Sequence, residues 1–153
     1  RFLGPGEEFS FQKETGETVP VTVKAFKSTD EGVAFLIEAE GKVLYHAGDL
    51  NNWVWEGEPE EYNFRMSEAF HSELLKIAGN HIDVAFMLLD PRQGKDFYLG
   101  MDDFMHMVGA DIVFPMHFWG DFGVTERFKT LPCAADYAEK IMEIRCQGES
   151  FQL

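Results

Sequence analysis

Short apolar stretches separated by turns dominate the first third of the chain. Residues 21–25 alternate apolar and polar side chains, which is the period of a strand with one buried face. Residues 33–37 are apolar throughout, which predicts a strand buried on both faces, and residues 43–45 form a further apolar run. The pattern predicts consecutive antiparallel strands joined by short loops, preceded by a polar loop over residues 4–19.

Helical and strand patterns alternate in the rest of the chain. The predicted helices cover residues 62–78, 100–108 and 133–146, and the predicted strands cover residues 82–89, 112–118 and 150–153. Antiparallel strands followed by this alternation predict an α/β (α+β) fold with a mixed sheet and helices on one face. The other face stays uncovered although residues 33–37 require burial on both sides. We therefore expect a second layer that these residues do not supply.

Charge and composition limit the classes of molecule with which the protein is expected to interact. The chain has 13 basic and 27 acidic residues, a formal net charge of −14, which repels nucleic-acid phosphates and anionic membranes and attracts cations. Its longest apolar runs, of about five residues, are too short to span a bilayer. Two cysteines are too few for a secreted disulfide framework, which favours a cytoplasmic protein. No linker or repeat divides residues 1–153, which predicts a single domain, whether monomeric or homo-oligomeric.

Candidate metal ligands follow two of the predicted strands. Asp49 comes after residues 43–45 and a small-residue turn, and His117 lies near the end of the strand at 112–118. If these strands are parallel, both side chains lie at one edge of the sheet, where open α/β sheets place functional groups. Aspartate and histidine are ligand types of divalent metals. The competing interpretations are an aspartate that closes a turn and a histidine satisfied within the core.

Further residues near this predicted edge are candidates for substrate binding. Asp90 follows the strand at 82–89, and the nearby Arg92 can bind an anionic group through a fork of hydrogen bonds. Trp53 and Trp119 belong to loops after predicted strands, where exposed aromatic side chains often line a pocket. The competing interpretations are an Asp-Pro turn with a solvated arginine, and tryptophans that close the core.

Three segments together resemble the C-terminal half of the metallo-β-lactamase-fold hydrolases, close to uncharacterised bacterial members. They are residues 28–35 (STDEGVAF), 45–51 (YHAGDLN) and 114–119 (FPMHFW), and the resemblance extends from about Phe2 to the last predicted helix. It implies a four-layer αββα sandwich with a metal site at the edge of its two sheets. It also implies that the N-terminal half, with its His-x-His-x-Asp-His ligand motif, is missing from these residues, which start at Arg1 without an initiator Met.

The resemblance also assigns roles to individual residues. Asp49 matches the carboxylate that bridges two metal ions, and His117 matches the last histidine ligand. The family's usual further histidine falls at Ser28-Thr29-Asp30, so Asp30 becomes a candidate oxygen ligand. The competing interpretation of that segment is a plain hairpin turn.

A metal-dependent hydrolase is the function that this resemblance implies. One or two ions, Zn²⁺ first and Mn²⁺ or Fe as alternatives, would activate a water that attacks an ester, amide, lactone or phosphodiester in a small-molecule substrate. Two ligands do not hold zinc tightly, so the missing half would complete the site, and this chain alone is expected to be inactive. The alternative is a non-catalytic binding or scaffold domain that keeps the fold without a complete metal site.

Overall fold

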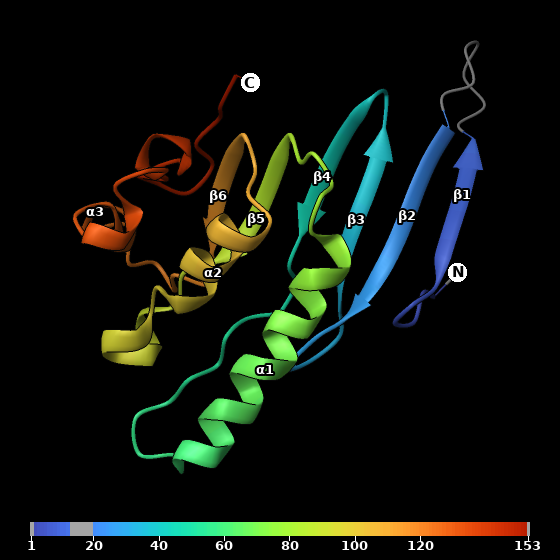
Figure 1. Cartoon of the computed structure of the whole chain (residues 1–153). Helices are drawn as coiled ribbons and strands as arrows, with labels where there is room; N and C mark the ends of the chain where they lie inside the picture. The colour runs from blue at the N-terminus through green and yellow to red at the C-terminus, as the bar shows by residue number, and fades with distance from the viewer. Residues whose placement is uncertain (1, 13–19, 153) are drawn as a thin grey trace.

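The computed structural model describes residues 2–12 and 20–152, which form one six-stranded sheet with helices packed against it (Figure 1). The strands, in their order across the sheet, are β1 (Glu8–Gln12), β2 (Pro20–Lys27), β3 (Val33–Ala39), β4 (Lys42–His46), β5 (Val84–Leu88) and β6 (Ile112–Met116). Strands β1 to β4 pair antiparallel, whereas β4, β5 and β6 run parallel. The predicted mixed sheet of an α/β chain is confirmed.

The helices connect and follow the parallel strands. They are α1 (Glu60–Ile77) before β5, η1 (Pro91–Asp96) and α2 (Leu99–Met107) before β6, and α3 (Val124–Lys129), η2 (Pro132–Ala134) and η3 (Ala138–Lys140) after β6. In α1, Phe70, Leu74 and Ile77 recur at helical spacing and are buried in the core. The helices predicted at 62–78 and 100–108 are present with shifted ends. None of the described helices is long and apolar enough to cross a membrane.

Side chains on one face of the sheet form the core beneath the helices. Residues paired across neighbouring strands point to the same face, so Leu36, Tyr45, Ala85 and Val113 mark this helix-covered face from β3 to β6. All of them are buried. The Tyr45 ring stacks on Phe104 of α2, with the ring centroids 5.3 Å apart. Figure 1 shows α1 and α2 lying across this same side of the sheet.

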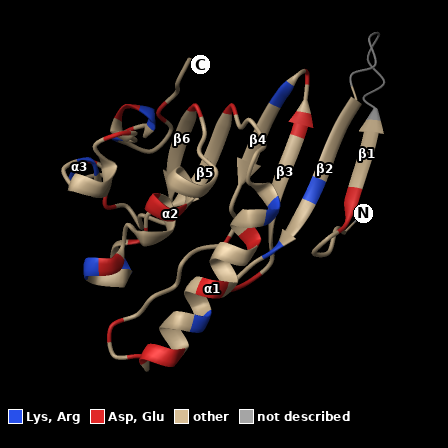
Figure 2. Cartoon of the chain, viewed as in Figure 1, with Lys and Arg blue, Asp and Glu red and all other residues tan. Residues whose placement is uncertain are grey.

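The opposite face, called the open face below, is mostly apolar, with Lys27 and His46 as exposed polar members, and is not covered by any of the described helices (Figure 1). Its partly exposed positions are Val21, Val23, Val33, Phe35, Ile37, Leu44, Val84, Phe86, Ile112 and Met116. Figure 2 shows β5 and β6 without charged residues, so the apolar surface extends to that side of the sheet. The C-terminal segment reaches its border, where the rings of Phe151 and Phe114 are 5.1 Å apart.

The apolar run of β3 predicts burial on both faces, but the described residues bury only one of them. Ala34 and Leu36 are buried toward the helices, whereas Val33, Phe35 and Ile37 are partly exposed on the open face. A continuous apolar run shows that both sides of a strand avoid water. It does not show that the described residues supply both covering layers.

The start of the chain also differs from the polar loop predicted over residues 4–19. Residues Glu8–Gln12 form β1, in which Phe9 lies opposite Val23 of β2. Hydrogen bonding along β2, the next strand in the chain, stabilises this short edge strand. Phe9 and Phe11 alternate with polar residues, a signal that the surrounding glycines and glutamates outweighed in the sequence. Residues 13–19 lie outside the part of the chain that the structure describes.

The prediction of a closing helix over residues 133–146 is wrong. The turns η2 and η3 are short 3₁₀ segments, and after them Ile141 forms a parallel bridge with Val113 of β6. The outer edge of β6 offers backbone groups that the extended chain can pair with, which outweighs the local helical spacing. The last predicted strand is also absent from residues 150–152, and Leu153 lies outside the described residues.

Candidate metal centre

Each of the three parallel strands ends beside a residue of the predicted site. Asp49 follows β4, Asp90 follows β5 and His117 follows β6, so these residues meet at the carboxyl edge of the sheet. The imidazole lies between two carboxylates: its Nε2 is 3.0 Å from Asp49 Oδ1, and its Nδ1 is 3.6 Å from Asp90 Oδ2. We call these three residues the carboxyl-edge site. The structure thus brings the two candidate ligands together and places Asp90 on the far side of the imidazole.

A tight turn positions Asp49. The backbone N–H of Leu50 donates to Ala47 O at 2.9 Å, and the indole Nε1 of Trp53 donates to the carbonyl oxygen of Asp49 at 2.9 Å. Gly48 has a φ of +59°, and a Cβ at this position would lie 2.5 Å from the carbonyl oxygen of Val33. Only glycine combines this left-handed backbone with so close an approach to β3.

The backbone also places His117 in an uncommon conformation. His117 has a φ of +60°, and Trp119 has a φ of +52°. Left-handed residues other than glycine cost about 1 to 3 kcal/mol each and persist where surrounding contacts hold them. The contact between His117 and Asp49 lies directly at one of these strained positions.

The carboxylate of Asp90 is fully buried, with 0% exposure, and is held by its own neighbours. Arg92 donates from its backbone N–H and from Nε to Oδ1, at 3.0 and 2.9 Å, and from Nη2 to Oδ2 at 2.5 Å. Trp119 Nε1 donates to Oδ2 at 3.3 Å. Burial raises the pKa of this carboxyl, but the hydrogen bonds from Arg92 and Trp119 outweigh burial and leave the pKa below its usual range. Asp90 is therefore an ionised carboxylate without contact with solvent.

Aromatic side chains flank the imidazole on two sides. Trp53 is 4% exposed, stacks in parallel on Trp55 and has its ring 6.1 Å from that of His117. Trp119 is 68% exposed, with its ring 6.2 Å from that of His117 and 4.5 Å from the guanidinium carbon of Arg92. Both predicted aromatic residues thus border the site, Trp53 from the core and Trp119 from the solvent side.

Asp30 lies at the surface and does not complete a set of three donors with Asp49 and His117. In the described residues, the group of potential metal ligands that does lie within mutual reach is His81, Asp83 and Asp111, at another place in the fold. The hydroxyl of Ser28 caps this turn by accepting from the backbone N–H of Asp30 at 3.1 Å. Its charge still adds to the larger effect of Asp90 in raising the pKa of Arg92, so it belongs to the same edge.

Behind the site lies a buried network of side-chain amides that the sequence pattern does not predict. Asn51 Nδ2 donates to Gln93 Oε1 at 2.8 Å, and Gln93 Nε2 donates to the carbonyl oxygen of Asn52 at 2.8 Å. Asn52 Nδ2 in turn donates to Asp103 of α2 at 2.8 Å. These bonds fix the loop that carries Asp49 to η1 and α2. The signal in the sequence was the pair Asn51-Asn52 beside apolar residues, which is too common to identify a network.

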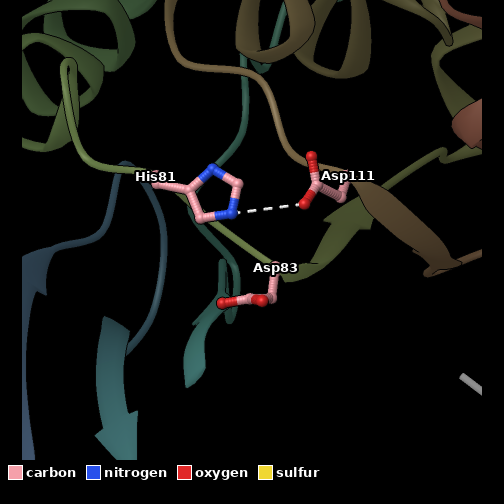
Figure 3. Close-up of side chains that lie close together, drawn as sticks. All are labelled: His81, Asp83 and Asp111. Atoms are coloured by element: carbon pink, nitrogen blue, oxygen red, sulfur yellow. Dashed lines mark ion pairs between the residues drawn. The ribbon is translucent and has the colours of Figure 1, made fainter. Parts of the chain in front are cut away.

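The group His81, Asp83 and Asp111 occupies the amino edge of the same parallel strands (Figure 3). His81 Nε2 is 3.2 Å from Asp111 Oδ2, and both side chains are exposed. Asp83 accepts from Lys42 Nζ at 2.6 Å and from the backbone N–H of Val43 at 2.8 Å, and these hydrogen bonds lower the pKa of its carboxyl. The ammonium group of Lys42 pairs with one oxygen of Asp83 and therefore competes with a bound cation for this carboxylate. We call these three residues the amino-edge group.

Neither a known protein-family model nor a curated protein sequence matches the chain. The chemistry of the carboxyl-edge site must therefore be inferred from the residues themselves. Their decisive property is that a buried, ionised aspartate, an imidazole and a partly exposed aspartate lie in a row at the ends of consecutive parallel strands.

Proposed function

We propose that the protein is a metal-dependent hydrolase of the metallo-β-lactamase type, in which Asp49 and His117 bind a zinc ion. The observation that carries this proposal is the 3.0 Å separation of His117 Nε2 and Asp49 Oδ1 at the ends of β6 and β4. Two ligand atoms of one tetrahedral zinc ion lie about 3.3 Å apart, so the pair needs only a small outward movement to admit the ion. Manganese or iron would fit the same nitrogen and oxygen donors.

The donor set is incomplete within the described residues. A catalytic zinc site takes three protein ligands and keeps one position for water, whereas Asp49 and His117 supply two. We attribute the remaining ligands to a second sheet that packs on the open face. That face is apolar over β2 to β6 and borders the carboxyl edge, which is the combination that a four-layer αββα sandwich requires.

The residues of this chain support hydrolysis of a small-molecule ester, amide, lactone or phosphodiester. A bound zinc ion would lower the pKa of its water to near neutrality and so provide hydroxide as the nucleophile. Arg92, whose guanidinium is half exposed, lies beside the exposed Trp119 and would bind an anionic group of the substrate. The net charge of −14 disfavours a nucleic-acid substrate, and two free cysteines are consistent with the cytoplasm that we propose as its location.

Metal analysis combined with denaturing intact-mass spectrometry tests this function on the purified intact protein. We expect about one or two zinc ions per chain and hydrolysis of a chromogenic ester or lactone. We also expect either a second polypeptide or a mass above 17.5 kDa. The proposal requires a second sheet, which belongs either to another polypeptide or to a longer form of this one.

A single species of 17.5 kDa without bound metal would contradict the proposal. The exposed position of Asp30 and the two-donor site would then favour a non-catalytic binding or scaffold domain. A double variant with Asp49→Ala and His117→Ala provides a second test. If it keeps the metal content of the parent protein, the ion lies elsewhere.

A further inference from the structure

The imidazole of His117 has one ring nitrogen with no hydrogen-bond partner among the described residues. This atom, Nδ1, is buried and faces Asp90 Oδ2 at 3.6 Å, while Nε2 faces Asp49 at 3.0 Å. A buried N–H or lone pair without a partner is destabilising, so such atoms call for an explanation.

We propose that Asp90 is the positioning residue of the His117 ligand: its carboxylate accepts the Nδ1–H and thereby leaves the Nε2 lone pair for the metal. A neutral imidazole carries one N–H, and the hydrogen bond made by one nitrogen decides which nitrogen binds the metal. This role rests on the proposed function, because it presupposes that His117 binds a metal ion. It differs from the substrate contact that the sequence suggested for Asp90.

Asp90 is suited to this role because its position is fixed. Its carboxylate has no exposed surface and is held through both oxygens by the guanidinium of Arg92. Oδ2 accepts from Arg92 Nη2 at 2.5 Å, from Arg92 Nε at 3.0 Å and from Trp119 Nε1 at 3.3 Å. The bond from Trp119 is the longest of the three, so we expect the imidazole N–H to take its place on this oxygen. A rotation of the ring that shortens 3.6 Å to about 3.0 Å completes the hydrogen bond.

This arrangement also gives Arg92 a function that does not depend on substrate. Arg92 pairs with Asp90 and lies over the Trp119 ring. The same guanidinium therefore holds the acceptor for His117 and the exposed aromatic residue beside the site. Replacing Asp90 removes both the acceptor that faces His117 and the ion pair that holds Arg92. Replacing the aspartate of another aspartate–arginine pair removes neither.

Zinc affinity and the protonated nitrogen of His117 together test this role. We expect Asp90→Asn to weaken zinc binding by about 10- to 100-fold in competition with a chromophoric chelator. The matched control is Asp121→Asn, which removes a carboxylate of the loop that carries His117; this carboxylate pairs with Arg127 at 2.6 Å instead of facing the imidazole. We expect that control to change zinc affinity by less than about twofold.

Long-range ¹⁵N–¹H spectra of the zinc-loaded parent protein give a readout that needs no variant. We expect His117 to carry its proton on Nδ1 and the metal on Nε2. Metal on Nδ1, or unchanged zinc affinity in a folded Asp90→Asn protein, would overturn the positioning role while leaving the proposed function intact. If Asp90→Asn does not fold, the parent spectrum decides. Absence of zinc from His117 in the parent protein would instead overturn the proposed function.

Discussion

The two edges of the parallel strands carry the same residue types, but these residues differ in burial and in hydrogen bonding. The carboxyl-edge site consists of Asp49, Asp90 and His117, and the amino-edge group consists of His81, Asp83 and Asp111. Each contains one histidine and two aspartates at the ends of β4, β5 or β6 or just before them. Proximity of ligand types alone therefore does not single out the metal site that we propose.

Burial and hydrogen-bond satisfaction do distinguish the two edges. At the amino edge, both oxygens of Asp83 accept hydrogen bonds from Lys42 and Val43, and the other two side chains are exposed. At the carboxyl edge, a buried carboxylate faces a buried imidazole nitrogen that has no partner among the described residues. At the amino edge both oxygens of Asp83 are therefore satisfied, whereas at the carboxyl edge one buried nitrogen has no partner among the described residues.

The largest expected effect is on metal binding. In the intact protein, Asp49→Ala and His117→Ala should each weaken zinc binding by at least about 1,000-fold, or about 4 kcal/mol, because each removes a ligand. His81→Ala and Asp111→Ala should leave zinc affinity within about twofold, since neither residue belongs to the proposed zinc site and Lys42 competes for the third member, Asp83. Isothermal titration with zinc measures all of them. An amino-edge variant that loses zinc while the carboxyl-edge variants keep it would reverse the comparison.

A smaller effect is expected from glycines at the two edges. Gly48→Ala should cost about 3 kcal/mol, because it combines left-handed strain with a Cβ 2.5 Å from the backbone oxygen of Val33. Gly109→Ala, next to the amino edge, also has a positive φ but meets Met105 O at an ordinary 3.5 Å. It should cost about 1 kcal/mol. Urea unfolding measures both, and equal costs would show that β3 yields to the added methyl group.

The smallest effect is on stability in acid. Asp83 and Asp90 both have folded-state pKa values below the ordinary value, so each stabilises the fold above about pH 4. This stability is lost as the pH falls through the folded-state pKa. Raising salt to about 1 M should diminish the contribution of the exposed Asp83–Lys42 pair and leave that of buried Asp90.

Urea unfolding of Asp83→Asn and Asp90→Asn at about pH 5 and pH 3 measures these contributions against the parent protein. We expect the difference between parent and Asp83→Asn to shrink in high salt, and the difference between parent and Asp90→Asn to persist. Equal salt sensitivity of the two differences would mean that Asp90 is as accessible to ions as Asp83, against its complete burial.

The amino-acid pattern predicted the elements that depend on near neighbours. The spacing of Phe70, Leu74 and Ile77 identified α1, and short turns between apolar runs identified the antiparallel order of β2, β3 and β4. It failed at β1, where the alternation over only five residues was outweighed by the polar residues around it, and after η3, where the edge of β6 pairs with the chain from 28 residues away.

For the site, the sequence by itself determined which residues carry suitable chemistry, and the tertiary structure decided how they relate. Asp49, Asp90, Arg92 and His117 each follow an apolar strand, and strand ends are visible in the local pattern. Only the parallel pairing of β4, β5 and β6 put them at one edge, and only packing buried Asp90 between Arg92 and His117. Strand direction and burial depend on contacts between residues far apart in the chain, which hydrophobic periodicity does not encode.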